Sequence, residues 1–152
     1  MAKLDEPAYD KLLERFKEFV GMVILDCGTG LQEPTARAAI KAADQLVLVT
    51  DAEPAAASLV AEAATTLVSS TRPITLVVNK MPPGGSRLDL ERLGRFVPHA
   101  RGLVVVPHEP HAAGGLTTGE FSWCDAPESW QLICRELAVS LISDWKRLGL
   151  TL

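Results

Sequence analysis

The stretch MVILDCGTG, residues 22–30, decides the predicted fold. Its first four residues form a continuous apolar run, which is typical of a buried strand in a parallel sheet. Asp26 ends the run, and Gly28 in the following turn lets the backbone approach a ligand closely. Open α/β sheets bind ligands at the carboxyl ends of their strands. Two interpretations of Asp26 are therefore open at this point: it holds a hydrated metal ion beside a phosphate, or it caps the turn.

Composition narrows the class of protein. A chain of 152 residues with 47% hydrophobic residues is long enough for one domain with a core and too short for two comfortable ones, so we expect a single domain over residues 1–152. The net charge of -4 argues against a general electrostatic attraction to nucleic acid. Cys27, Cys124 and Cys134 lack the paired spacing of a zinc site or disulfide framework, which favours a reducing cytosol. Since no apolar run reaches the roughly 18 residues that span a bilayer, we expect a cytoplasmic protein without a transmembrane segment.

Hydrophobic patterning extends the fold on both sides of this stretch. An amphipathic helix over residues 4–20 precedes it, and its apolar face is expected to pack on a core. Three further apolar runs follow and alternate with helical segments; they are residues 46–49, 74–78 and 103–106. This alternation predicts βαβ crossovers over residues 22–107. The predicted fold class is therefore α/β, with a parallel sheet of about four strands flanked by helices.

The last third of the chain has a different pattern. Residues 108–125 contain scattered glycines and are predicted to form an irregular loop. Residues 127–147 are predicted to form a long helix whose apolar face is core, because apolar residues recur there at steps of three and four. These residues are Trp130, Ile133, Cys134, Leu137, Leu141 and Trp145.

Polar residues follow three of the four predicted strands, and a proline follows the fourth. Because the carboxyl ends of parallel strands meet at one edge of a sheet, these residues are expected to converge. They are Asp26, Thr50 with Asp51, Asn79 with Lys80, and Pro107. An acid can hold a hydrated metal ion, and an amide can both donate to and accept from a base edge. The set predicts a nucleotide site, although the sequence contains no G-x-x-x-x-G-K-[ST] loop to hold the phosphates.

The order of these motifs resembles a known family. The segments are VILDCGTGL, ADQLVLVTDAEP, ITLVVNK and VVVPHEPHAAGG. In this order they are similar to the carboxyl-terminal two thirds of the MinD/ParA family of deviant-Walker P-loop ATPases. The ending most resembles the MinD-like proteins associated with actinobacterial type VII secretion. The resemblance implies a P-loop NTPase fold that lacks its N-terminal βα portion.

The resemblance also implies a site, cofactors and partners. Asp26 would be the Walker B acid that helps to hold magnesium, beside the turn containing Gly28. Asn79 would contact the adenine of ATP. The segment from Pro107 and His108 to Gly115 would lie over the base. Family members close a dimer on binding ATP and open it on hydrolysis, so the resemblance implies a dimeric switch, with secretion-machinery proteins as partners.

The missing phosphate loop sets the main expectation about activity. Without its backbone amides and lysine the triphosphate loses most of its positioning and charge neutralisation, so the isolated chain should not hydrolyse ATP efficiently. The chain would then be either a fragment of a longer protein or a natural remnant. The strand before that loop would lie within a family-type sheet, so we expect self-association or a partner chain to cover an exposed sheet edge. A non-catalytic pseudo-ATPase that acts as a protein-interaction module is the alternative.

Three groups of residues suggest other functions, and each of these functions is disfavoured. Asp26, Thr50 and Lys80 imitate the strand-end residues of a response-regulator receiver, but a receiver opens with a strand and this chain opens with a helix. His108 and His111 form an H-x-x-H pair without a placed third ligand, so an ordinary polar loop is favoured over a metal site. Cys27 is interpreted as a small buried residue in preference to a reactive thiol.

Overall fold

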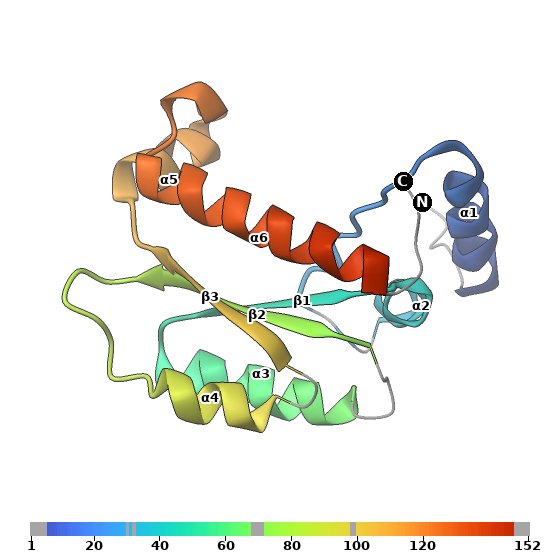
Figure 1. The fold of residues 1–152 in the computed structure, drawn as a ribbon, viewed down its shortest axis with the longest axis horizontal. Helices are drawn as coiled ribbons and strands as arrows, with labels where there is room; N and C mark the ends of the chain where they lie inside the picture. The colour runs from blue at the N-terminus through green and yellow to red at the C-terminus, as the bar shows by residue number, and fades with distance from the viewer. Residues whose placement is uncertain (1–5, 30, 32, 68–71, 98–99, 148–152) are drawn as a thin grey trace. The chain divides into compact units, whose positions relative to one another are not determined.

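A computed structural model describes residues 6–29, 31, 33–67, 72–97 and 100–147 (Figure 1). The chain divides into two compact units, of which the first spans Met1–Asp44 and the second spans Gln45–Thr151. Each unit has its own secondary structure and its own buried residues.

The first unit contains two helices. Helix α1 spans Glu6–Phe19, close to the predicted 4–20, and packs on α2, which spans Pro34–Ala42 and begins with a proline in its first turn. Of the apolar face predicted for α1, only Leu13 is buried, so the expectation that this whole face packs on a core is wrong. The buried residues of α2 are all alanines, which offer α1 little apolar surface.

The predicted first strand does not form. Residues 22–25 have no strand assignment and no ladder partner among the described residues. Met22 is 49% exposed, Val23 38% and Ile24 86%. A strand is stabilised by its neighbours, through ladder hydrogen bonds and cross-strand side-chain contacts, so an apolar run without a neighbour stays irregular. The sheet of the described residues accordingly has three strands instead of about four.

The second unit is built on that sheet. Strands β1 (Leu46–Asp51), β2 (Ile74–Met81) and β3 (Ala100–Pro107) are parallel and lie in the order β1-β2-β3. Ile74, Leu76 and Val78 of the central strand are the largest fully buried side chains among the described residues. The core of this unit is therefore centred on β2.

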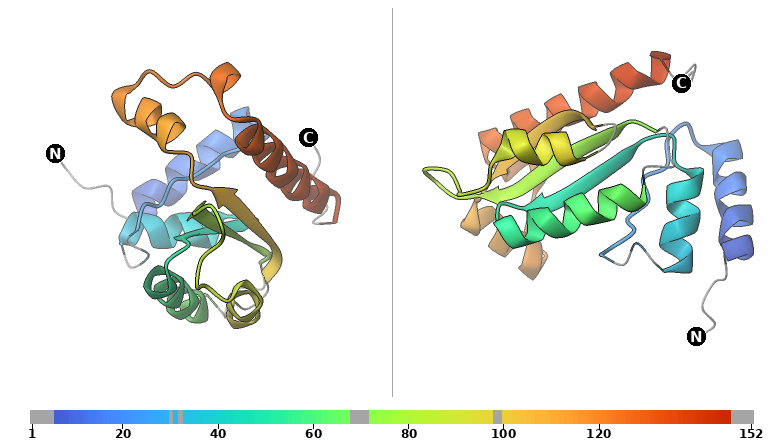
Figure 2. Two further views of the ribbon diagram at one scale, coloured as in Figure 1. Left: turned by 90° about the vertical axis from the view of Figure 1, so that its left-hand side faces the viewer. Right: turned by 90° about the horizontal axis from the view of Figure 1, so that it is seen from below.

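Helices cover both faces of the sheet (Figure 2). On one face, α3 (Pro54–Thr66) packs on β1 and α4 (Leu90–Phe96) packs on β3. On the other face, α6 (Glu128–Arg147) packs on β3. Helix α4 begins at Leu90 because the Asp89 carboxylate accepts a hydrogen bond from the Arg92 N–H at 2.8 Å and caps the helix there. The predicted α/β class, with a parallel sheet flanked by helices, is confirmed.

The segment after β3 differs from the prediction of an irregular loop over residues 108–125. It contains the helix α5 (Pro110–Thr118) and a short 3₁₀ turn at Trp123–Asp125. Pro110 is favourable in the first turn of a helix, and Gly119, with a φ of 77°, ends α5 in the left-handed conformation. These end signals outweighed the two glycines inside the helix, which the prediction had taken as signs of a loop.

The terminal helix α6 agrees with the predicted 127–147 to within one residue. Cys134, which was predicted to lie on the core face, is exposed. Trp145 was placed on the same face, but its side chain lies outside the description. Among the helices of the described residues, none combines the length and apolar character needed to cross a membrane.

Candidate functional site

Three strands of the second unit end at the same sheet edge. Asp51 at the end of β1 is in register with Asn79 of β2, and Met81 of β2 is in register with Pro107 of β3. The backbone N–H of His108 donates to the Met81 carbonyl at 2.8 Å and extends the contact between β2 and β3 by one residue. The parallel sheet thus brings together most of the polar strand ends that the sequence singled out.

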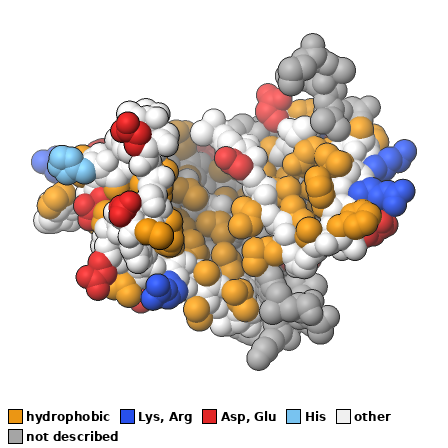
Figure 3. Space-filling view, turned by 90° about the horizontal axis from the view of Figure 1, so that it is seen from above, with side chains coloured by type: hydrophobic (Ala, Val, Ile, Leu, Met, Phe, Trp, Pro, Cys, Tyr) orange, Lys and Arg blue, Asp and Glu red, His pale blue; other side chains and the backbone are white. Residues whose placement is uncertain are grey.

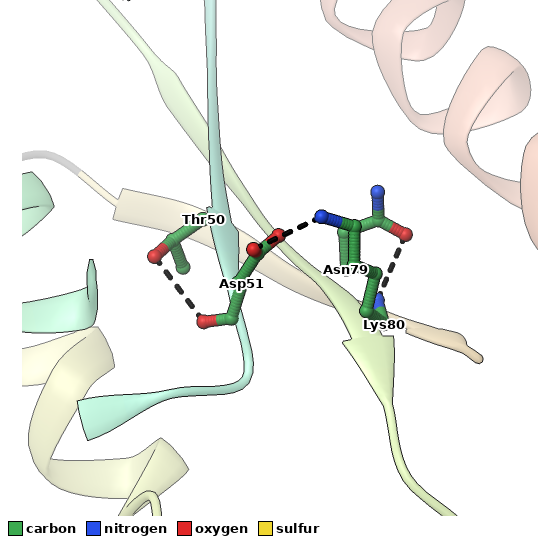
Figure 4. Close-up of polar contacts among 4 residues, drawn as sticks. All are labelled: Thr50, Asp51, Asn79 and Lys80. Carbon is green, nitrogen blue, oxygen red and sulfur yellow. Dashed lines mark hydrogen bonds and ion pairs between the residues drawn. The ribbon is translucent and has the colours of Figure 1, made fainter. Parts of the chain in front are cut away.

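Asp51 and Lys80 form an ion pair across this edge (Figure 4). Lys80 Nζ lies 3.1 Å from Asp51 Oδ2, and both side chains are about half exposed. Exposed pairs of this kind contribute between about 0 and 1 kcal/mol to stability. Thr50, which is buried, donates its hydroxyl hydrogen to the Asp51 carbonyl at 3.3 Å. The pair therefore sets local charge and geometry and adds little to stability.

Lys80 has an unusual backbone conformation. Its φ of 55° makes it the one residue other than glycine with a positive φ in the described part of the chain. Asn79 Oδ1 accepts a hydrogen bond from the Lys80 N–H at 2.9 Å, and the pairing of β2 with β3 shifts register between Val78 and Met81. A bulge of this kind re-aims side chains at the end of a strand. The left-handed conformation costs a residue with a Cβ about 1–2 kcal/mol, and such cost recurs at ligand sites.

The end of β3 is packed against aromatic side chains. Trp130 Nε1 donates to the Pro107 carbonyl at 3.1 Å. The Phe121 ring lies 6.2 Å from the Trp130 ring and 6.5 Å from the Trp123 ring, measured between centroids. These contacts hold the segment after β3 beside the strand end, while the side chain of His108 remains exposed.

Gly115 lies inside α5. A Cβ built on it would lie 3.6 Å from the backbone of Phe121, and its carbonyl accepts from the N–H groups of Glu120 and Phe121. These contacts are structural, because they close α5 against the aromatic segment. The assignment of Gly115 to a segment over a bound base stays a prediction.

Asp26 and Gly28 belong to the first unit. Asp26 Oδ1 accepts a hydrogen bond from the Gly28 N–H at 2.9 Å, and Gly28 has a φ of 60°. This contact agrees with the simpler of the two interpretations of Asp26, an acid that closes its own turn. Its assignment to a magnesium site stays a prediction, but the strand that was to present it does not form.

Cys27 is a poor candidate for a reactive thiol. Partial burial, and secondly the negative charge of Asp26, raise the pKa of this thiol above its ordinary value of 9.0. The thiolate is the reactive form, so both effects lower its population near neutral pH. His108 and His111 gain no third ligand either, since the described residues contain no group of three or more His, Cys, Asp or Glu side chains suited to a metal ion.

The sequence reasoning missed two features of the edge. An open hollow of about 580 Å³ lies between the start of α3 and the turn after β2. It is lined by Ala52, Glu53, Pro54, Pro82, Gly84, Gly85, Ser86 and Arg87. The paired prolines and glycines after β2 could have indicated a turn that leaves space beside the strand end. The positive φ of Lys80 has no comparable signal, because lysine does not favour the left-handed conformation.

Comparisons with known proteins found no relative of this chain. No family model matches the chain, and no significant match to a curated protein or to a solved structure was found.

Proposed function

We propose that this chain is the carboxyl-terminal part of a MinD/ParA-like, ATP-dependent switch protein. In this proposal the ends of β2 and β3 bind the adenine base. The observation that carries it is the left-handed backbone of Lys80 beside Asn79, at an edge where three parallel strands end. Strained residues persist where the surrounding structure holds them, and parallel α/β sheets bind ligands at this edge.

The chemistry of Asn79 fits the edge of a base. Its Oδ1 already accepts from the Lys80 N–H, so Nδ2, on the other side of the amide, is the group left to donate (Figure 4). Adenine offers ring nitrogens as acceptors, and one amide N–H is enough to engage one of them. Pro107 and His108 lie on the neighbouring strand end and give the base an apolar and a polar neighbour.

The phosphate side fits less well. Magnesium is usually held by one or two carboxylates together with substrate phosphates, and when bound it would neutralise phosphate charge. Asp26 is the proposed carboxylate, but it is engaged with Gly28. The 152 residues contain no G-x-x-x-x-G-K-[ST] loop. We therefore propose nucleotide binding through the base side, with inefficient hydrolysis by the isolated chain.

A carboxamide deletion tests this proposal. Asn79→Ala should weaken Mg-ATP binding about fivefold to tenfold in isothermal titration calorimetry, because one hydrogen bond to the base is lost. Gln45→Ala is the matched control: Gln45 is a carboxamide one residue before β1, and its Nε2 donates to the Leu141 carbonyl at 3.0 Å. Gln45→Ala should leave ATP affinity unchanged. Equal affinities for Asn79→Ala and the unmodified chain would refute the base assignment.

A second candidate function is a non-catalytic protein-interaction module. It is favoured by apolar side chains exposed around the segment after β3, where Leu116 is 55% exposed and Trp123 49%. By the resemblance, its partners would be secretion-machinery proteins. A folded chain that binds no Mg-ATP at millimolar concentration would favour this candidate over the ATP-dependent switch.

A further inference from the structure

One peptide group at the end of β3 is held from two sides. It joins Pro107 to His108. Its C=O group accepts a hydrogen bond from the indole N–H of Trp130 in α6 at 3.1 Å, and its N–H group donates to the Met81 carbonyl of β2 at 2.8 Å. Because a peptide group is planar, these two hydrogen bonds together fix its orientation. The chain therefore leaves the end of β3 in one defined direction.

A second contact from the same turn of α6 holds the residue that follows. Ser129 precedes Trp130 in the first turn of this helix, and its Oγ donates to Glu109 Oε1 at 3.2 Å. Two neighbouring residues of one helix thus hold the carbonyl before His108 and the side chain after it. The His108 side chain is exposed, and Figure 3 shows histidine (pale blue) at the surface that the segment after β3 forms. The start of α6 therefore fixes the backbone at His108 and leaves its ring accessible.

The same peptide group closes the irregular stretch that contains Asn79. The pairing of β2 with β3 shifts register between Val78 and Met81, and it resumes where Met81 meets Pro107. The bond from the His108 N–H to the Met81 carbonyl lies directly after this stretch. A bulge re-aims the side chains within it. The position of the Asn79 amide therefore depends on how the end of β3 is held.

We propose that Trp130 is a positioning residue for the base of the bound nucleotide. It acts through the peptide group between Pro107 and His108, which it holds against β2 beside Asn79. The inference rests on the proposed function, because it concerns the same strand ends. Its physical basis is preorganisation: a segment that is ordered before the ligand arrives loses less conformational freedom on binding. Without the indole N–H, binding has to order this segment, and the affinity falls.

The aromatic neighbours of Trp130 offer a way to separate this role from simple packing. The Phe121 ring lies 6.2 Å from the Trp130 ring and 6.5 Å from the Trp123 ring, so two indoles neighbour the same phenyl ring. Trp130 is the one that donates to the Pro107 carbonyl, whereas Trp123 is 49% exposed. Phenylalanine at either position keeps an aromatic ring in the cluster and removes an indole N–H. The two substitutions therefore form a matched pair.

Isothermal titration calorimetry with Mg-ATP tests the positioning role. Trp130→Phe should raise the dissociation constant about threefold to tenfold, because the hydrogen bond that holds the strand end is lost. Trp123→Phe is the control, and its dissociation constant should stay within about twofold of that of the unmodified chain. In an Asn79→Ala background, Trp130→Phe should have a smaller effect than it has alone, because the amide that it helps to place is already absent. A merely structural role would give the same factor in both backgrounds.

The indole N–H of Trp130 gives a second measurement, made on the unmodified chain and independent of how a variant folds. Its signal in the nitrogen–proton NMR spectrum should shift when Mg-ATP is added, because its acceptor belongs to the segment beside the base. The corresponding signal of Trp123 should not shift.

The outcomes distinguish this inference from the proposed function. Failure of the unmodified chain to bind Mg-ATP would overturn both. Weaker binding in Asn79→Ala, together with unchanged binding in a folded Trp130→Phe chain, would overturn the positioning role alone. An equal loss of affinity in Trp123→Phe, equal factors in the two backgrounds, or a Trp130 indole signal that does not respond to Mg-ATP would overturn it as well.

Discussion

Residues 22–25 and residues 74–78 of strand β2 are two apolar runs of similar composition with opposite fates. Each is followed by a polar residue with a short side chain, Asp26 in one case and Asn79 in the other. Strand β2 lies between β1 and β3, and its Leu76 is fully buried. Residues 22–25 form no strand, and Ile24 is 86% exposed. An apolar run therefore marks a segment that is able to become a strand, and its neighbours in space decide whether it does.

The turns after these two runs extend the comparison. In each, the polar side chain accepts a hydrogen bond from a backbone N–H close behind it, namely that of Gly28 or of Lys80. Both of these residues have a positive φ, 60° for Gly28 and 55° for Lys80. Glycine adopts this conformation at no steric cost, whereas lysine does not. The backbone at Lys80, near the end of β2, therefore stores strain that the turn after residues 22–25 lacks.

The largest effect is expected from truncating one apolar side chain in each run. Leu76→Ala should lower the free energy of unfolding by about 3 kcal/mol, because it leaves a cavity under the central strand. Ile24→Ala should lower it by less than about 0.5 kcal/mol, since the side chain is already in water. Urea unfolding followed by circular dichroism measures both. A loss above about 1 kcal/mol for Ile24→Ala would mean that residues 22–25 are buried in solution and would break the comparison.

Exchanging the residues with positive φ should have effects of opposite sign. Lys80→Gly relieves the steric cost of the left-handed conformation and should raise the free energy of unfolding by about 0.5 kcal/mol, after the entropic cost of glycine. Gly28→Ala introduces the same steric cost and should lower it by about 1 kcal/mol. The same urea titrations report the two values. Destabilisation by Lys80→Gly would show that the Lys80 side chain contributes more than the strain costs.

The smallest effect concerns the thiol in the turn after residues 22–25. Because burial and the Asp26 charge raise the pKa of Cys27, its alkylation rate should reach half of its maximum above pH 9.0. Asp26→Asn removes the smaller cause and keeps an oxygen that can accept from Gly28, so the midpoint should fall while staying above that value. Alkylation by iodoacetamide, resolved by peptide mass spectrometry, follows each cysteine separately. A midpoint unchanged by Asp26→Asn would show that burial alone sets the pKa.

Much of the fold could be predicted from patterns within short segments. Continuous apolar runs located β1, β2 and β3, and helical periodicity located α6 to within one residue. Helix α5 was missed because the prediction gave more weight to its glycines than to Pro110 at its start and Gly119 at its end. Of the proposed site, the order of the parallel strands was enough to predict that Asp51, Asn79 and Pro107 share an edge. The strain at Lys80 was not predictable, because it arises from a register shift between β2 and β3.

The sequence by itself determined which segments are helical, which are apolar and extended, and which polar residues follow the strands. Those properties depend on residues close together in the chain, through side-chain periodicity, proline and glycine geometry, and capping. The tertiary structure alone decided that residues 22–25 stay outside the sheet and that β1 lies at its edge. A strand exists only through hydrogen bonds and side-chain contacts with another strand, and no local pattern specifies where that neighbour lies.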